Sequence, residues 1–247
     1  MRLLTLLAGF FLALSCLPAM AADTPDLAAL IHDVEVQYTG RSSHAIMAMQ
    51  VKTEHWQRTM EMECWSLGRD YFLTRITEPA KDRGVSTLKR DKDVWNYLPK
   101  VDRVVKVPAS LMGGSWMGSH ITNDDLVKES QVDKDYTFTL LQQDAGIFRI
   151  EGIPRTDAAV VWGKIIYTLD RKRRVPLKVE YYDEDQTKVR DIVFSDVKQV
   201  GDRLIPLMMT VQPTDKPDER TVVTYRDITF DVPLQDDFFS LRNLKKR

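Results

Sequence analysis

The sequence of 247 residues has little cysteine, glycine or proline, and each shortage excludes a class of protein. It contains 2 cysteines, 11 glycines and 11 prolines. Two cysteines cannot build the disulfide framework that holds many small secreted domains together. So little glycine and proline excludes a collagen-like or low-complexity chain. With 43% hydrophobic residues, the chain can bury a sizeable core.

The sequence also lacks an excess of charge of either sign. Its 35 basic and 36 acidic residues leave a net charge of -1. Proteins that bind nucleic acid usually carry a strongly basic face, so we expect no nucleic-acid partner. One basic run, Arg171–Arg174, falls in a predicted turn. Either a solvated edge or a contact with anionic lipid or an acidic partner would explain it.

After its first residues the chain has no apolar run of the ~20 residues that a membrane-spanning helix needs. Residues 3–14 are nearly all apolar, and Ala19-Met20-Ala21 fits a signal-peptidase site. This pattern predicts a cleaved signal peptide over residues 1–21 and a single exported domain over residues 22–247. Cys16 resembles a lipid-attachment cysteine, but Ala13 stands where the usual Leu precedes it, so we expect no lipid anchor.

Motifs for catalysis are missing. None of the four histidines has metal-ligand spacing with another His or Cys. A hydrolase elbow around Ser115 would need Gly at position 117, where Met stands. Cys64 falls on the same side of an alternating segment as the apolar residues Met60 and Met62, which predicts a buried, inert thiol. We therefore expect no enzyme activity, no metal and no cofactor.

The hydrophobic pattern predicts one helix over residues 25–38, followed by strands with a period of two. A shorter alternation surrounds Phe72 and Ile76. The clearest other strands cover residues 45–51, 60–64, 93–100, 103–107, 136–142, 147–153, 164–170, 177–183, 189–197, 203–211 and 221–230. Short turns with Gly, Asp and Asn join them, so we expect an antiparallel up-and-down sheet of roughly eleven strands.

Residues 108–127 interrupt the alternation with an apolar stretch rich in Met, Trp and Gly. This insert either covers the open end of the sheet or acts as a movable lid over an apolar cavity. Met47, Met49, Met60 and Met62 share one phase of two neighbouring strands. They favour either an ordinary core or an adaptable surface for acyl chains, which flexible methionines suit.

Several segments together resemble a known family. They are Val94–Lys100 (VWNYLPK), Arg103, Ser110–Ser115 (SLMGGS), Asn123–Leu126 (NDDL) and the ending Pro233–Leu241 (PLQDDFFSL). The chain resembles the outer-membrane lipoprotein-sorting-like proteins, the LolA-like family, in the branch that contains a Treponema domain of unassigned role. The resemblance implies a mainly β (α+β) fold: an incomplete antiparallel β-barrel of about eleven strands with an N-terminal helix and a short helical lid.

The resemblance also implies a role. Better-studied relatives bind the acyl chains of lipoproteins and carry them across the periplasm, and this branch is often associated with RND-type exporters of the inner membrane. We therefore expect a monomeric periplasmic carrier whose partners are a lipid or an acylated lipoprotein and an inner-membrane exporter. The alternative is an adaptor of such an exporter that binds no ligand, for which Trp65 and the Arg171–Arg174 turn would matter more.

The carrier hypothesis names a set of site residues. The expected lipid-binding residues are Met47, Met49, Met60, Met62, Phe72, Trp95, Tyr97, Leu111, Met112, Trp116 and Met117. Gly113, Gly114 and Gly118 are expected to act as the hinge of the lid.

Overall fold

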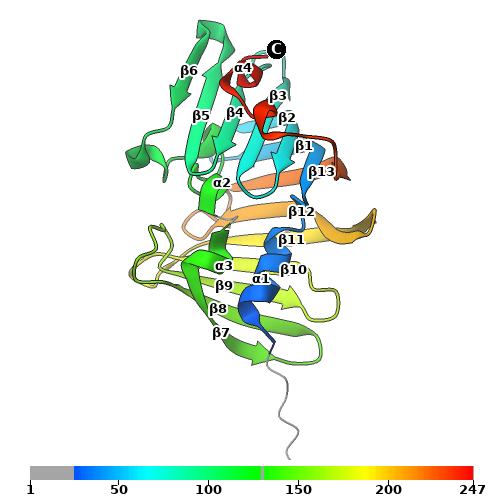
Figure 1. The fold of residues 1–247 in the computed structure, drawn as a ribbon. Helices are drawn as coiled ribbons and strands as arrows, with labels where there is room; N and C mark the ends of the chain where they lie inside the picture. Colours follow the sequence, from blue (N-terminus) through cyan, green and yellow to red (C-terminus); the bar gives the residue numbers. More distant parts are fainter. Residues whose placement is uncertain (1–24, 129–130, 247) are drawn as a thin grey trace, which may run out of the picture.

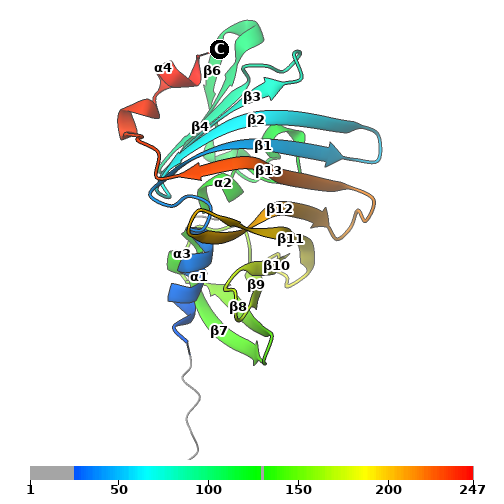
Figure 2. The same cartoon turned by 90° about the vertical axis from the view of Figure 1, so that its right-hand side faces the viewer.

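One antiparallel sheet of 13 strands forms the protein in the computed structural model, which describes residues 25–128 and 131–246. The sheet curves and twists strongly without closing, because β6 and β7 remain as its two edges (Figures 1 and 2). Its spatial order is β6-β5-β4-β3-β2-β1-β13-β12-β11-β10-β9-β8-β7. This is the incomplete antiparallel barrel that the resemblance implied.

The strands near the middle of the sheet are the longest. In chain order they are β1 (Ser42–Lys52), β2 (Gln57–Leu67), β3 (Tyr71–Glu78), β4 (Ser86–Arg90), β5 (Asp93–Leu98), β6 (Arg103–Lys106), β7 (Tyr136–Gln143), β8 (Ile147–Pro154), β9 (Lys164–Asp170), β10 (Pro176–Tyr182), β11 (Lys188–Val200), β12 (Arg203–Pro213) and β13 (Arg220–Phe230).

The helices are short. They are α1 (Leu27–Glu35), α2 (Asp125–Lys128), α3 (Val132–Asp135) and α4 (Leu241–Leu244), with 3-10 turns η1 (Pro99–Val101), η2 (Ala109–Leu111), η3 (Trp116–Gly118) and η5 (Asp236–Phe238). The insert predicted over residues 108–127 forms η2, η3 and most of α2.

The path of the chain explains why the insert covers the sheet. Strands β1 to β6 proceed to one edge, and β7 starts at the opposite edge and leads back to β13, which pairs with β1. The chain between β6 and β7 must therefore cross from one edge of the sheet to the other. It carries η2, η3, α2 and α3 over the face that α1 also covers (Figure 1).

The methionine pattern of the first two strands is confirmed. Met47 lies directly opposite Met62, and Met49 lies opposite Met60. All four side chains are buried in the main core, where Cys64 follows them on the same face. Such directly opposite residues on one face are in contact across an antiparallel pair.

The N-terminal helix is shorter than the expected range of residues 25–38. It begins after Asp26, whose carboxylate accepts a hydrogen bond from the backbone N–H of Ala29 at 3.1 Å. It ends at Glu35, because the chain then turns so that Tyr38 stacks on Tyr225 with ring centroids 5.2 Å apart. A tertiary contact thus ends the helix three residues before the position that periodicity alone indicates.

The expected count of about eleven strands was too low, and β4 is the strand without a sequence signal. Ser86, Thr87, Leu88 and Lys89 are all buried, so both faces of this strand are covered and no polar alternation marks it. Leu88 belongs to a second core on the outer face, which the C-terminal segment covers with Phe239 and Leu244. Figure 2 shows α4 beside this part of the sheet.

The predicted signal peptide over residues 1–21, with Cys16, lies outside the described residues and remains a prediction. Within the described part of the chain, no helix is both long and apolar enough to cross a membrane.

Candidate functional site

A cavity of about 260 Å³ lies between the sheet and the segments that cross it. Its walls come from α1, α2, β1 to β4 and β9 to β13, together with η3 and the turn after β2. The apolar side chains of the lining include Val34, Met47, Phe72, Trp116, Ile121, Leu126, Val179, Phe194, Met209 and Val223. This volume is just below the roughly 300–1,000 Å³ of typical ligand sites, so the cavity suits one narrow apolar group.

A second hollow of about 430 Å³ lies beside the start of α1. Its lining includes Asp26, Asp33, Arg171 and Arg174, with Phe148 as the only aromatic side chain. Four charged groups around so little apolar surface make it a poorer site for an acyl chain than the cavity under the insert.

Trp116 is the aromatic residue of the insert that lines the cavity, together with Ile121, Asp125 and Leu126. Its side chain is 3% exposed, and its indole nitrogen donates a hydrogen bond to the Thr87 hydroxyl at 3.0 Å. The backbone N–H of Trp116 also donates to the carbonyl of Ile121, which closes the insert into a compact loop. The ring is therefore held against the wall by partners on both β4 and the insert itself.

Two polar contacts fasten the insert to the far half of the sheet. Arg190 of β11 donates to both carboxylate oxygens of Asp125 at 2.7 Å, and both side chains are buried. The guanidinium also lies 4.5 Å from the ring centre of Tyr181 and 4.6 Å from that of Trp162. His120 lies 3.0 Å from Glu219 and 2.9 Å from the Thr221 hydroxyl.

The end of the cavity near α1 is charged. Arg69, in the turn after β2, donates to both oxygens of Asp133 at 2.5 and 3.0 Å and to Glu35 at 2.6 Å. His32 lies 2.9 Å from Asp133. Burial raises the pKa of Glu35 to about 9, despite the nearby guanidinium of Arg69.

Asp133 behaves in the opposite way. Burial would raise its pKa, but hydrogen bonds from Arg69 and His32 outweigh that effect and lower the pKa to about 2. At neutral pH, Arg69 is therefore paired with an ionised Asp133, while Glu35 is largely protonated.

Lys89 projects from β4 into the same end of the cavity. Its side chain lines the cavity and is 2% exposed, and its ammonium donates to the backbone carbonyl of Arg69 at 2.5 Å. Burial lowers the pKa of Lys89 to about 8, and the nearby Asp70 opposes this shift. A lysine this deeply buried is unusual, because burying a charge is energetically costly.

The structure brings only part of the predicted lipid-binding set to the cavity. Met47, Phe72 and Trp116 line it. Met49, Met60 and Met62 are fully buried in the main core on the same face as Met47, but they do not line the cavity.

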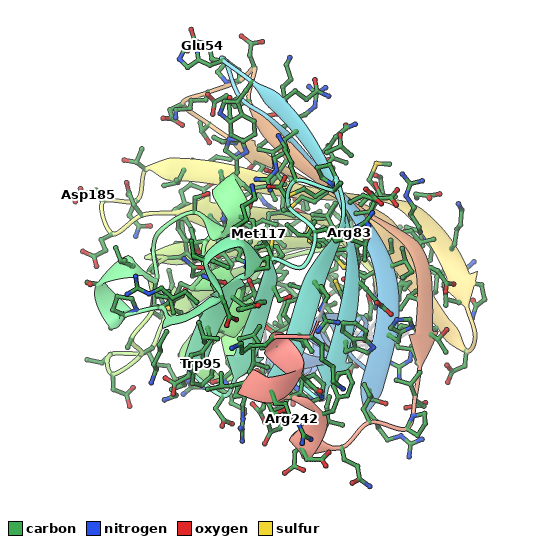
Figure 3. All side chains as sticks on the ribbon, turned by 90° about the horizontal axis from the view of Figure 1, so that it is seen from above. Glu54, Arg83, Trp95, Met117, Asp185 and Arg242 are labelled. Carbon is green, nitrogen blue, oxygen red and sulfur yellow. The ribbon has the colours of Figure 1, made fainter. Side chains whose placement is uncertain are left out.

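The rest of the predicted set lies elsewhere. Tyr97 and Trp95 belong to the second core, which the C-terminal segment covers, because their strand turns these rings to the outer face. Leu111 is 58% exposed, Met112 is half-buried, and Met117 packs against the edge of the main core. Figure 3 shows Met117 near the middle of the molecule and Trp95 toward the side of Arg242 on α4.

The hinge glycines sit in an exposed part of the insert, and Gly118 has a φ of +73° that favours glycine. A Cβ at Gly114 would lie 3.0 Å from the carbonyl oxygen of Leu111. Their role as a hinge remains a prediction.

The polar residues of the cavity were absent from the sequence-based set. Glu35, Arg69, Lys89 and Asp125 line it, and they come from α1, a turn, β4 and α2. No spacing in the sequence relates these four elements, so only the fold brings them together. An acidic last residue of a helix and a lysine in a short strand carry no signal of a site by themselves.

Cys64 is buried as expected, and burial raises the pKa of its thiol to about 12. Across residues 25–128 and 131–246, no group of three or more His, Cys, Asp or Glu side chains is placed to hold a metal ion.

An open antiparallel sheet, curved around a cavity and crossed by one helix and an inserted segment, defines the class of lipoprotein-sorting half-barrels. A domain of Vibrio parahaemolyticus described as an outer membrane lipoprotein-sorting protein domain is 25% identical to the chain, with a TM-score of 0.76 over 89% of this chain and 98% of that one. Residues 68–246 match a family model whose description is "uncharacterized protein", and the chain belongs to that family.

Two further solved structures share the fold. A DUF1329 family protein from Desulfovibrio piger is 21% identical, with a TM-score of 0.78 over 88% of this chain and 97% of that one. A LolA superfamily protein from Nitrosomonas europaea is 18% identical, with a TM-score of 0.72 over 87% of this chain and 97% of that one. No curated protein matches the chain.

Proposed function

We propose that the protein is a periplasmic carrier that binds a lipid or a lipoprotein acyl chain in the cavity under the insert and shuttles it toward the outer membrane. The observation that carries the proposal is the cavity itself: about 260 Å³, with a mostly apolar lining. The likeness to a lipoprotein-sorting domain supports the same role.

The mechanism is reversible burial without chemistry. Each methylene that leaves water for an apolar wall contributes about 0.8 kcal/mol. A chain that is only partly buried can therefore reach micromolar affinity, which needs about 8 kcal/mol. Moderate affinity also suits a carrier, because the ligand must leave again at its destination.

The insert would act as the lid. Trp116 reaches the cavity, and the glycines at 113, 114 and 118 give the surrounding loop the freedom to move it. An inner-membrane exporter of the RND type would deliver the ligand, and the exported mature chain of residues 22–247 would act as a monomer.

Mass spectrometry of the mature protein tests this proposal directly. Residues 22–247 are produced in the periplasm and purified without detergent, and native and denaturing masses are compared after solvent extraction. A stoichiometric mass difference of lipid size supports the carrier. A clean apo mass that persists after incubation with phospholipid and with an acylated peptide would contradict it and favour an adaptor of an exporter.

A further inference from the structure

The hairpin of β5 and β6 ends in an exposed apolar tip. This hairpin tip, residues 98–103, contains η1 and joins the two strands. Val101 is 67% exposed, the highest value among the exposed large hydrophobic residues of the described chain, and Leu98 is 41% exposed. Single apolar side chains on a surface are ordinary, so the surroundings of the tip decide whether these two have a role.

Basic side chains gather around the hairpin tip from three separate parts of the chain. They are exposed and come from the turn between β3 and β4, the tip itself and the C-terminal segment: Lys81, Arg83, Lys100, Arg103, Lys245 and Lys246. The three parts are neighbours in space. A Cβ at Gly84, which follows the first two residues, would lie 3.6 Å from Pro99, and the Lys245 ammonium lies 3.0 Å from the Asp102 carboxylate. Figure 1 shows the C-terminus beside this end of the hairpin.

The acidic residues at this end are fewer, and each already has a partner. Asp102 also accepts a hydrogen bond from the Tyr97 hydroxyl at 3.0 Å, Glu78 pairs with Arg83, and Asp82 pairs with Arg58 at 3.0 Å.

Four of the six basic side chains remain without an ion pair. Among residues 25–128 and 131–246, no carboxylate lies within ion-pair distance of Lys81, Lys100, Arg103 or Lys246. The hairpin tip and its surroundings are therefore positively charged, although the whole chain has a net charge of -1. A cationic surface of this kind attracts anionic partners.

The other basic run of the chain lacks this combination. In the Arg171–Arg174 turn, one arginine pairs with Asp170 at 2.8 Å, and Asp26 and Asp33 line the same hollow as two others. The next residue, Val175, is fully buried. Its charges are thus largely balanced and are not accompanied by an exposed aliphatic side chain, so this turn serves as a natural comparison for the hairpin tip.

We propose that the hairpin tip and the C-terminal lysines form a docking surface for an anionic phospholipid bilayer. Val101 and Leu98 would enter the boundary between head groups and acyl chains, while the basic side chains around them remain at the lipid phosphates. The aliphatic end favours a bilayer over an acidic protein, because a bilayer admits a projecting apolar tip without a matching pocket.

This surface is separate from the proposed carrier site. None of residues 98–103 lines the cavity. A protein that is docked by this tip therefore keeps its cavity lining intact, and the docking proposal can fail while the carrier function stands.

Flotation of the mature protein with two kinds of vesicle tests the proposal. One kind contains phosphatidylglycerol and phosphatidylcholine in equal amounts, and the other contains phosphatidylcholine alone. We expect binding to the mixed vesicles to be at least about tenfold tighter, because each basic side chain near an anionic surface contributes. Binding should weaken as the salt concentration rises. Uptake of a lipid into the cavity does not make the protein float, so this measurement reports docking alone.

Two variants separate the contributions of charge and apolar contact. Lys100→Gln combined with Arg103→Gln should weaken binding to the mixed vesicles at least about tenfold. Val101→Ser keeps every charge and removes the aliphatic contact, so it should weaken binding severalfold, and the loss should persist at high salt.

Each variant has a matched control elsewhere on the surface. Lys172→Gln combined with Arg174→Gln removes two exposed cations from the other basic run. Leu141→Ser removes an aliphatic side chain of β7 that is 47% exposed. Both controls should bind the mixed vesicles as the wild type does. All the substituted side chains are exposed, and thermal unfolding checks that each variant is folded.

Three results would overturn the proposal. The first is a wild-type protein that does not float with the mixed vesicles. The second is an equal loss in the tip variants and their controls, which would mean that any surface charge or aliphatic residue matters as much. The third is a Val101→Ser variant that binds like the wild type, which would make the contact purely electrostatic and favour an acidic protein as the partner.

Discussion

Arg190 and Asp125 form a buried, bidentate ion pair that ties the insert to β11, with both contacts at 2.7 Å. The two residues are 65 positions apart in the sequence, and the guanidinium is enclosed by the rings of Trp162 and Tyr181. This pair, the His120 contacts and the Trp116 hydrogen bond to Thr87 together hold the insert over the cavity.

Asp125→Ala is accordingly expected to lower the free energy of unfolding by about 3–5 kcal/mol, because it leaves the Arg190 charge buried without its carboxylate. Urea denaturation measures the effect. Asp93→Ala, which breaks an exposed pair with Lys106, should change stability by less than about 1 kcal/mol. Combining Asp125→Leu with Arg190→Met should recover most of the lost free energy of unfolding, because no charge is then left buried. A double variant as unstable as Asp125→Ala would show that the unpaired charge is not the cause of the loss.

Trp116→Asp should abolish the retention of a bound lipid and leave the sheet folded, because it places a carboxylate on the apolar wall of the cavity. Leu111→Asp is the matched control on the same insert. Its side chain is 58% exposed and does not line the cavity, so retention should be unchanged. The amount of lipid per protein after purification measures retention in both variants, and circular dichroism measures whether each is folded. Equal retention in the two variants would show that Trp116 is not part of the site.

The sheet could be predicted from the sequence wherever one face of a strand is buried and the other is exposed to solvent. Strand β9 matches its predicted range of residues 164–170 in full, and the opposition of Met47 to Met62 follows from the same alternation. Strand β4 could not be found this way. Its Ser, Thr and Lys side chains are polar in the sequence, yet they lie buried under the insert on one face and the C-terminal segment on the other.

The candidate site shows the same limit more sharply. Periodicity identifies Trp95 and Tyr97 as apolar but cannot tell which of two covered faces they occupy, and they lie in the outer core. Lys89 and Glu35 are ordinary surface residue types whose importance comes from tertiary burial alone. Trp116 was found because an apolar segment with three glycines stands out from a regular alternation.

Glu35 should make the stability of the protein depend on pH. Its pKa is raised by burial from 4.5 to about 9, so the folded state favours the protonated form. The stabilisation is complete below pH 4.5 and is lost as the pH rises toward 9. Glu35→Gln preserves an oxygen that can accept the hydrogen bond from the Val132 N–H and cannot ionise.

Thermal unfolding between pH 5 and 8 therefore distinguishes the wild type from the Glu35→Gln variant. The wild type should lose stability relative to Glu35→Gln as the pH rises, because its carboxyl ionises in the unfolded chain but stays protonated in the fold. Glu35→Leu, which removes the acceptor for both Val132 and Arg69, should be less stable than either at every pH. Parallel pH profiles for the wild type and Glu35→Gln would show that this carboxyl is already ionised in the fold.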